Sequence, residues 1–418
     1  MSGFPEFNYR DNELFVESVP LQKIAETYGT PCYVYSRSAL TKAYQEFETA
    51  FAGRDHLICY AVKANSNIAI LNLFARLGSG FDIVSGGELQ RVLQAGGDPG
   101  KTVFSGVGKS RAEIQLALAA NILCFNVESE AELITLNQVA QSMGTIAPVS
   151  LRVNPDVDAK THPYISTGLK ENKFGIPAST AGSIYQSARK YSNIRFTGLD
   201  CHIGSQLTEL GPFMQASEKM LQLLNTLQSQ GLEIEHLDLG GGLGIRYTHE
   251  TPPTIKNYVS LLCASTQHIQ QRLLIEPGRS LVGNSGILLT RIEYLKHTSA
   301  RNFAIVDAAM NDLMRPALYD AYHEILPVLN SRAEAKRYEV VGPVCETGDF
   351  LGHDRELAVE TGDLLSVMSA GAYGMSMSSN YNTRPRAAEI MVDQDKTYVI
   401  RQRETIDQLI ASEQTLPQ

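Results

Sequence analysis

Several features that would assign a chain to a special class are missing from this sequence. No apolar stretch approaches the roughly 18 residues that a membrane-spanning helix requires. The first residues, Met1 to Phe7, lack the basic and then apolar pattern of a secretory signal. No run of lysine and arginine stands out, and the net charge is −9, which argues against a nucleic-acid-binding surface. We therefore expect a cytoplasmic protein that acts on a small molecule and has no nucleic-acid or membrane partner.

Cysteine pairs with a recognisable spacing are also missing. The six cysteines, at positions 32, 59, 124, 201, 263 and 345, show neither CxxC spacing nor a histidine at a zinc-like interval. We predict that most of them are small core residues and that no metal is bound. Repeats and low-complexity tracts are absent as well, which disfavours solenoid and disordered classes. What is present, 418 residues of which 43% are hydrophobic and 19% charged, is enough for two domains with large cores.

Apolar runs of strand type alternate with helix-periodic segments between about residues 37 and 281. The strand candidates are 57–62, 80–84, 102–105, 124–127, 148–153, 197–202, 236–240 and 273–276. The amphipathic segments between them include 87–95, 130–143, 213–227 and 255–269. Eight strands joined by helical crossovers within roughly 250 residues predict a TIM-type (β/α)₈ barrel over 37–281. An open doubly wound sheet is the alternative, because periodicity alone does not distinguish the two.

The pattern changes after residue 281, where strand-type runs follow one another without intervening helices. These runs are 287–295, 303–306, 338–341, 356–359, 363–367, 388–392 and 396–401. They predict a second, antiparallel β domain over 282–418. The N-terminal residues 1–36 are expected to belong to it, since the apolar run Cys32 to Tyr35 is suited to one more strand.

Chemically distinctive residues follow four of the eight predicted barrel strands. Lys63 follows the first, His202 the sixth, and Glu276 the eighth, while three glycines, 240–242, follow the seventh. A single lysine at a strand end is more often solvated than catalytic. Residues with only structural roles have no reason to gather at the carboxyl ends of barrel strands, where active sites are built. A partly desolvated lysine there can form a Schiff base with a carbonyl compound such as pyridoxal phosphate.

The glycines suit the phosphate of such a cofactor, and the glutamate suits its ring nitrogen. Glycine lacks a Cβ, so backbone N–H groups at 240–244 can approach a phosphate closely. This is not a dinucleotide motif, because Ile245 stands where the third glycine is needed. Glu276 could pair with a protonated pyridine nitrogen, and His202 could lie flat against the ring. A tight structural turn is the alternative for the glycines.

Two local signals predict helix starts rather than ligand sites. Gly106 to Ser110 is similar to a phosphate-binding loop, yet Val103 stands where that loop needs its first glycine. We interpret Ser110 and Glu113 as a capping box. Asn67, next to Ser66, is expected to cap a helix over 68–77.

Three loop-like stretches of the second domain also carry reactive side chains: 314–319, 342–349 and 369–374. Arg315, together with Arg279, could hold substrate carboxylates through paired hydrogen bonds. Cys345 is a possible proton donor, and Glu346 a possible partner for an ammonium group. Taken singly, Cys345 is more typical of a buried thiol and Glu346 of a solvated carboxylate.

The ordered motifs together resemble one family over nearly the whole chain. They are Tyr60 to Asn65, His202 to Gln206, Gly240 to Gly242, Glu276 to Arg279, Cys345 to Gly348 and Gly371 to Gly374. The chain is similar at these positions to diaminopimelate decarboxylases, which are group IV pyridoxal-phosphate-dependent decarboxylases of the alanine-racemase-like fold. The resemblance implies conversion of meso-2,6-diaminopimelate to L-lysine and carbon dioxide, the last step of lysine biosynthesis. It also implies a homodimer with shared active sites.

The resemblance implies a role for each matched residue. Lys63 would hold pyridoxal 5'-phosphate covalently, His202 would stack on its ring, and Glu276 would meet its pyridine nitrogen. The phosphate would be surrounded by Ser205, Gly241, Gly242, Gly278 and Arg279. Residues 37–281 would thus form the cofactor-binding domain.

The substrate residues implied by the resemblance are mostly in the second domain. Substrate would be held by Arg279, Arg315, Tyr319, Glu346 and Tyr373, the last of which would also touch the cofactor. Cys345 and Glu346 would reach in from the second subunit, so that residues 1–36 and 282–418 supply substrate and dimer contacts. The final proton would come from Cys345 or from Lys63, and the sequence leaves that choice open.

Two other functions remain compatible with the fold. One is a decarboxylase acting on ornithine, arginine or carboxynorspermidine, and the other is a non-catalytic homologue that binds the cofactor. Diaminopimelate carries an ammonium and a carboxylate at its distal centre, so it needs an anion and a cation together, whereas ornithine offers only the ammonium. Glu346 with the Arg315 and Tyr319 pair supplies both, and retention of Lys63 and Cys345 favours an enzyme.

Overall fold

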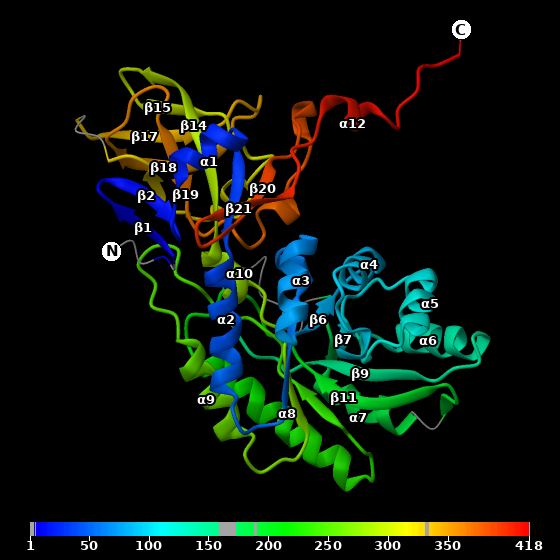
Figure 1. Cartoon of the computed structure of the whole chain (residues 1–418). Helices are drawn as coiled ribbons and strands as arrows, with labels where there is room; N and C mark the ends of the chain where they lie inside the picture. Colours follow the sequence, from blue (N-terminus) through cyan, green and yellow to red (C-terminus); the bar gives the residue numbers. More distant parts are fainter. Residues whose placement is uncertain (1–3, 5, 159–172, 188–189, 331–333, 418) are drawn as a thin grey trace. The chain divides into compact units, whose positions relative to one another are not determined.

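A computed structural model of the chain describes residues 4, 6–158, 173–187, 190–330 and 334–417 (Figure 1). The chain divides into two compact units. Unit 1 comprises Met1–Lys42, Arg246–His249 and Val282–Gln418, and unit 2 comprises Ala43–Ile245 and Glu250–Leu281. Among the described residues, no helix combines the length and the apolar character needed to cross a membrane.

Unit 2 is a closed parallel barrel in the part of the chain that the structure describes. Its strands are β5 (His56–Ala61), β6 (Gly80–Ile83), β7 (Thr102–Phe104), β8 (Cys124–Val127), β9 (Ala147–Asn154), β11 (Ile194–Asp200), β12 (His236–Asp238) and β13 (Arg272–Ile275). Each strand pairs with the next, and β13 returns to pair with β5, so the sheet has no open edge. The short strand β10 (Ile176–Pro177) pairs outside the ring with β9. The predicted barrel is confirmed, and the open doubly wound alternative is wrong.

Helices connect the barrel strands and pack on their outer side (Figure 1). They are α3 (Ile68–Leu77), α4 (Gly86–Gln94), α5 (Arg111–Ala120), α6 (Glu130–Ser142), α7 (Ala178–Ser187), α8 (Gly211–Ser229) and α9 (Ile255–Ser265). Helix α2 (Arg37–Ala50) precedes the first barrel strand, and α10 (Arg279–Val282) follows the last. Both predicted caps form: the side chain of Asn67 accepts a hydrogen bond from the N–H of Ala69, and Ser110 and Glu113 make a reciprocal capping box. Such caps satisfy N–H groups that the first helical turn leaves without partners.

Unit 1 is built on a sheet in the order β18-β17-β15-β14-β4-β20-β21, with β19 joining β14 to β16. The strands are β4 (Cys32–Ser36), β14 (Gly286–His297), β15 (Asn302–Val306), β16 (Ile325–Pro327), β17 (Lys336–Val341), β18 (Phe350–Leu357), β19 (Leu364–Val367), β20 (Ala388–Asp393) and β21 (Lys396–Arg401). Most pairs are antiparallel, as predicted, but β15–β17 and β4–β20 are parallel. The expected N-terminal strand is β4, which pairs with both β14 and β20.

The elements of unit 1 that the sequence pattern did not reveal are short or polar. A three-stranded sheet of β1 (Phe7–Arg10), β2 (Glu13–Val16) and β3 (Val19–Pro20) precedes α1 (Leu21–Tyr28). Strand β18 covers 350–357 rather than the predicted 356–359, because polar residues 353–356 interrupt its apolar character. The remaining helices are α11 (Arg315–Tyr319) and α12 (Ile406–Ile410).

The cysteines divide into core residues and one surface residue. All six are free and lie within the described part of the chain. Cys32, Cys59, Cys124 and Cys201 are buried, as predicted, and Cys263 is half-buried. Cys345 is exposed. Its thiol is therefore accessible to a molecule outside unit 1, which a core cysteine would not be.

Candidate active site

Lys63 lies just beyond the carboxyl end of β5, in the turn Val62–Ala64. The N–H of Ala61 donates to the carbonyl of Pro277 at 3.1 Å, which joins this turn to the segment after β13. The Lys63 Nζ donates to Asp82 on β6, a carboxylate with no exposed side-chain surface. Because the Lys63 side chain itself is 33% exposed, its amine is both held by a buried anion and accessible from outside.

Glu276 follows β13 and is 5% exposed. Its Oε1 accepts from the Asn126 Nδ2 at 3.2 Å and from the Ser105 Oγ at 3.4 Å. Burial raises the pKa of Glu276 well above its usual range, and the carboxylates of Asp238 and Asp82 raise it further. This carboxyl group is therefore suited to share a proton with a basic nitrogen.

Glu276 belongs to a cluster of carboxyl groups inside the barrel. Oxygens of Glu276, Asp200 and Asp238 all lie within 4.8 Å of one another. Burial raises the pKa of Asp238 to about 7, although the hydrogen bond from the Gly240 N–H lowers it, so this carboxyl retains a proton more readily than a solvated aspartate does. Arg152, with its Nη1 3.0 Å from Glu128, faces Asp200 at 3.9 Å. The spacing of the three carboxyls would suit a cation, but burial raises the pKa of Asp200 and of Glu276, which disfavours the ionised form that a metal ion needs.

Sequence reasoning missed this cluster, although a signal was present. Asp82, Asp200 and Asp238 each interrupt one of the predicted apolar strands. A charged residue inside a strand that is buried on both faces has to meet a partner or keep its proton. Among the described residues, one oxygen of each of these three carboxyls has no protein donor.

His202 and the glycines after β12 form a compact unit. The N–H of Gly241 donates to the His202 Nδ1 at 3.1 Å, so the neutral ring carries its proton on Nε2. Burial and the positive charges of Arg152 and Lys63 hold the pKa of His202 well below its usual range. A neutral imidazole can pack flat against an aromatic ring without adding a charge.

Two of these glycines are required by the backbone. Gly240 and Gly242 have φ values of 67° and 110°, a region that favours glycine. A Cβ on Gly241 would lie 2.2 Å from the carbonyl oxygen of Glu276. The glycines thus allow the end of β12 to approach the end of β13 closely, a contact that was not predicted from the sequence.

The remaining predicted barrel residues lie beside these glycines. Arg279 is 5% exposed, and its Nη2 donates to the Ser205 Oγ at 3.1 Å. A Cβ on Gly242 would lie 2.5 Å from the carbonyl of Gly204, and one on Gly278 would lie 3.2 Å from Ala61. A guanidinium, a hydroxyl and glycine N–H groups form a donor set that fits a phosphate.

All eight predicted barrel residues therefore come from one end of four neighbouring strands. The strand order is β11-β12-β13-β5, and the residues follow these strands at their carboxyl ends. The set joins a lysine, a carboxyl group of raised pKa and a phosphate-type donor set. It fits a cofactor with an aldehyde, a basic ring nitrogen and a phosphate.

The predicted residues of unit 1 include a buried arginine on a short helix. Arg315 and Tyr319 begin and end α11, so the spacing of four residues places them on one face. Arg315 is 6% exposed, and its Nη1 donates to the Tyr247 hydroxyl at 2.8 Å and to the His323 Nε2 at 3.0 Å. Neither Tyr247 nor His323 was singled out from the sequence, because their contact with Arg315 depends on the folded chain.

Cys345 and Glu346 lie in an exposed loop of unit 1 that is held by the buried Asp349. Asp349 accepts from the N–H of Val344 at 2.8 Å, one residue before Cys345. The N–H of Cys345 donates to the Asn382 side chain at 3.0 Å. The Tyr381 hydroxyl donates to Glu346 at 2.8 Å. The loop is thus fixed by its own unit while it presents a thiol and a carboxylate to the outside.

Tyr373 has an unusual backbone conformation for its residue type. Its φ is 55°, which is uncommon for a bulky side chain. The neighbouring Gly371 packs so tightly that a Cβ would lie 1.9 Å from the carbonyl oxygen of Val282. Local strain of this kind is often concentrated at functional sites.

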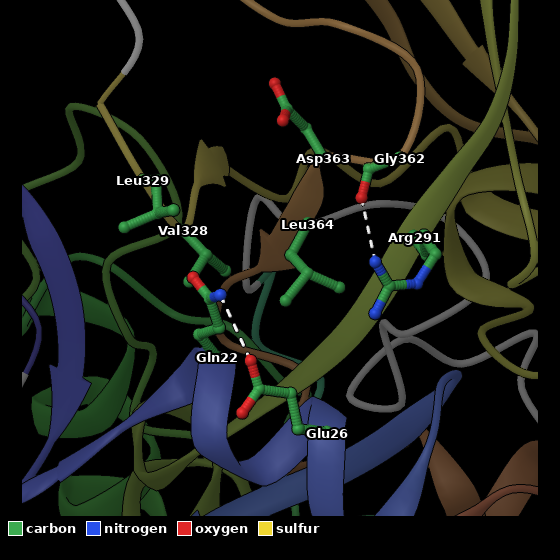
Figure 2. A pocket seen from close by; sticks show the side chains of 8 residues that line it. All are labelled: Gln22, Glu26, Arg291, Val328, Leu329, Gly362, Asp363 and Leu364. Carbon is green, nitrogen blue, oxygen red and sulfur yellow. Dashed lines mark hydrogen bonds between the residues drawn. The ribbon is translucent and has the colours of Figure 1, made fainter.

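Unit 1 also contains a hollow of about 260 Å³, which is separate from the predicted site residues (Figure 2). It is lined by Gln22, Glu26, Arg291, Val328, Leu329, Gly362, Asp363 and Leu364. The polar groups in it mostly satisfy one another: Gln22 donates to Glu26 at 3.1 Å, and Arg291 donates to the carbonyl of Gly362 at 2.8 Å. The predicted site residues are not among its lining residues.

Comparison with known families agrees with the chemistry of the barrel. Residues 37–283 match the family described as "Pyridoxal-dependent decarboxylase, pyridoxal binding domain". Fold and site together define a pyridoxal-dependent decarboxylase, with pyridoxal 5'-phosphate as the cofactor.

Full-length relatives define the family more narrowly. The chain is 57% identical over 414 residues to a diaminopimelate decarboxylase of Vibrio cholerae, covering 99% of both chains. It is 58% identical over 412 residues to that of Pseudomonas aeruginosa, again covering 99% of both. The solved diaminopimelate decarboxylase of M. jannaschii in complex with L-lysine superimposes with a TM-score of 0.95 at 38% identity, covering 100% of this chain and 99% of that one. The chain belongs to the diaminopimelate decarboxylase family.

Proposed function

We propose that the chain removes carbon dioxide from meso-diaminopimelate and releases L-lysine, the last step of lysine biosynthesis. The observation that carries this proposal is the set of site residues at the ends of β11, β12, β13 and β5. Lys63 and Glu276 are joined there through the backbone contact between Ala61 and Pro277. An ornithine-type decarboxylase or a non-catalytic homologue is disfavoured by the full-length identity to diaminopimelate decarboxylases.

The residues of the barrel would each hold one part of pyridoxal 5'-phosphate. Lys63 would bind its aldehyde carbon, Glu276 would share a proton with the ring nitrogen, and His202 would lie against the ring. The phosphate would be held by Ser205, Gly241, Gly242, Gly278 and Arg279. When bound, the cofactor supplies an electron sink for the electron pair that departing carbon dioxide leaves behind.

The chain's own residues would control the protons of the reaction. Asp82 holds the Lys63 amine when the lysine carries a proton. Glu276 would keep the ring nitrogen protonated, because the surrounding carboxyls favour a positive charge at that place. The Cys345 thiol would protonate the carbon that lost its carboxylate, with the Lys63 Nζ as the competing donor.

Substrate choice would depend on the distal centre, which is unchanged by the reaction. Arg279 and Arg315 would meet its carboxylate, Glu346 its ammonium group, and Tyr319 and Tyr373 would complete the pocket. Two solved relatives, from M. jannaschii and Helicobacter pylori, are complexes with L-lysine, which carries both of these groups.

We further propose a cytoplasmic homodimer whose two subunits share their active sites. Cys345 and Glu346 would serve the site of the other subunit, since their loop is exposed in its own unit and fixed by Asp349. A thiol that donates a proton has to stay reduced, which the cytoplasm favours. Residues 37–281 would bind the cofactor, while 1–36 and 282–418 would supply substrate and dimer contacts.

Carbon dioxide release from four compounds tests this function. The cofactor-loaded protein would be assayed side by side with meso-diaminopimelate, its LL isomer, L-lysine and L-ornithine. We expect release from the meso compound and at least about 100-fold less from ornithine, because a site built for a distal carboxylate leaves its cations unpaired without one. Comparable release from ornithine would contradict the assignment.

A further inference from the structure

The surroundings of Arg315 in unit 1 give this residue a fixed orientation. We infer that His323 is a positioning residue that aims the Arg315 guanidinium, and so sets the preference for a ligand with a distal carboxylate. The inference rests on the proposed function, in which Arg315 meets that carboxylate. In this inference, His323 contacts the substrate-binding Arg315 and not the substrate itself.

The hydrogen bonds of His323 define the state of its ring. His323 is 0% exposed. Its Nδ1 lies 2.8 Å from the carbonyl of Met368, which can only accept, so Nδ1 carries a proton. Its Nε2 lies 3.0 Å from the Arg315 Nη1, which can only donate, so Nε2 is the acceptor. His323 is therefore a neutral ring in one tautomer, and the lone pair of its Nε2 accepts from Arg315.

Tyr247 constrains the same guanidinium from a second direction. Its hydroxyl accepts from the Arg315 Nη1 at 2.8 Å, and its ring lies 4.8 Å from the guanidinium carbon. The Tyr247 and His323 rings meet edge to face, with centroids 5.2 Å apart. Nη1 thus donates to two neutral acceptors, the Tyr247 hydroxyl and the His323 Nε2, which fixes the plane of the guanidinium. A carboxylate would have to approach the other nitrogens.

The backbone around His323 is held as firmly as its ring. The Arg355 Nη2 donates to the carbonyl of His323 at 3.1 Å. The N–H of Met368 donates to the carbonyl of Glu324 at 2.8 Å, which ties the residue after His323 to the end of β19. The position of the imidazole is therefore set by the sheet of unit 1, and Arg315 takes its orientation from that sheet.

Two substitutions separate the Arg315 contact from the rest of the network. His323→Asn keeps a donor near the Nδ1 position, facing Met368, but places nothing at Nε2. His323→Gln places an acceptor near the Nε2 position and so retains the contact with Arg315. If His323 aims Arg315, the asparagine variant should lose distal-carboxylate recognition and the glutamine variant should largely keep it.

L-Lysine and cadaverine form a matched pair of probes, since cadaverine is lysine without its carboxylate. Their dissociation constants would be measured by titration calorimetry on the cofactor-loaded protein. We expect His323→Asn to weaken lysine binding about tenfold and cadaverine binding less than about twofold, the size of one misplaced charged hydrogen bond. The KM for meso-diaminopimelate should rise by a similar factor, while kcat changes less than about threefold.

Arg315→Met separates failure of the inference from failure of the function on which it rests. The methionine variant should lose the preference for lysine over cadaverine. If it keeps that preference, Arg315 is not the carboxylate group, and the proposed function is wrong at this residue. If it loses the preference while His323→Asn keeps it, the positioning role of His323 alone is overturned. Equal weakening of both ligands in both His323 variants would also overturn it, because that result indicates a purely structural residue.

Discussion

The barrel site and the Cys345 loop differ in how complete they are within one chain. At the barrel ends, polar groups meet partners from neighbouring strands, as the Gly241 contact with His202 and the Arg279 contact with Ser205 illustrate. In the loop, Cys345 is exposed, and Glu346 is bound by Tyr381, which is itself 42% exposed. The barrel is thus prepared for its ligand by one chain, whereas the loop is ordered but faces outwards. We infer that the loop has its function in the partner subunit.

The two units also differ in the kind of ionisable group that they bury at the predicted site. The barrel gathers carboxyl groups around Glu276, which favours a positively charged group such as a protonated ring nitrogen. In unit 1, Arg315 is buried against the neutral groups of Tyr247 and His323, which favours a carboxylate. This difference agrees with the proposed division of roles, in which the barrel holds the cofactor and unit 1 recognises the substrate.

The largest expected effect is on the barrel side of this comparison. Lys63→Ala should abolish the yellow absorbance of the bound cofactor and lower turnover by at least about a thousandfold, because the covalent anchor is lost. Absorbance spectra and carbon dioxide release measure both. Lys101→Ala is a matched control, since Lys101 immediately precedes β7 at the opposite end of the barrel. A Lys63→Ala protein that stays yellow and active would contradict the anchor.

The loop side of the comparison is tested by Cys345→Ala. Turnover should fall about a hundredfold while the absorbance of the cofactor stays, since the thiol is expected to donate a proton and not to bind the cofactor. Thr347→Ala serves as the control, because it changes an exposed neighbour in the same loop. Near-wild-type turnover of Cys345→Ala would remove its assigned role.

Mixing the two inactive proteins tests whether the sites are shared. If Cys345 acts in the partner's site, a dimer of one Lys63→Ala chain and one Cys345→Ala chain contains one intact site. After subunit exchange at equal amounts, half of the dimers are mixed, so about one quarter of wild-type activity should return. No recovery despite exchange, measured by a size tag on one chain, would place both residues in one chain's site.

The sequence predicted the barrel well because its signals are local. Each barrel strand was recognised as a mostly apolar run between helix-periodic segments. The short strands β1, β2, β3 and β16 were missed, because two to four residues carry too little periodicity to distinguish a strand from a loop.

The interior network could not be predicted in the same way. Asp238 is a polar residue in an apolar run, but its neighbour Glu276 follows another strand, β13. His323 gave no signal at all, because its role depends on Met368 and Arg315, which only the folded chain brings to it. Such side-chain contacts arise from the tertiary fold, so a sequence motif that contains one residue of a contact does not identify the other residue.

The smallest expected effect concerns the carboxyl cluster, through Asp238→Asn. Asp238 accepts from the N–H of Gly240 at 2.9 Å, and an asparagine oxygen can keep that bond while the side chain carries no charge. The variant therefore imitates a permanently protonated Asp238. Its stability should depend less on pH than that of the wild type, which thermal unfolding of the cofactor-free chain at several pH values would measure.

The direction of the effect follows from the pKa of Asp238, which is raised to about 7 in the folded chain against an unfolded value of about 4. Below about pH 4 the folded and the unfolded chain both hold the proton, so the stability that Asp238 contributes is fully present there. As the pH rises towards about 7, the unfolded chain gives up the proton while the folded chain retains it, and stability is lost. Asp238→Asn should therefore gain about 1–3 kcal/mol relative to wild type between about pH 5 and pH 8. Asp395→Asn, a substitution at an exposed aspartate, is the matched control. A parallel pH dependence of wild type and Asp238→Asn would contradict the raised pKa of Asp238 in the folded barrel.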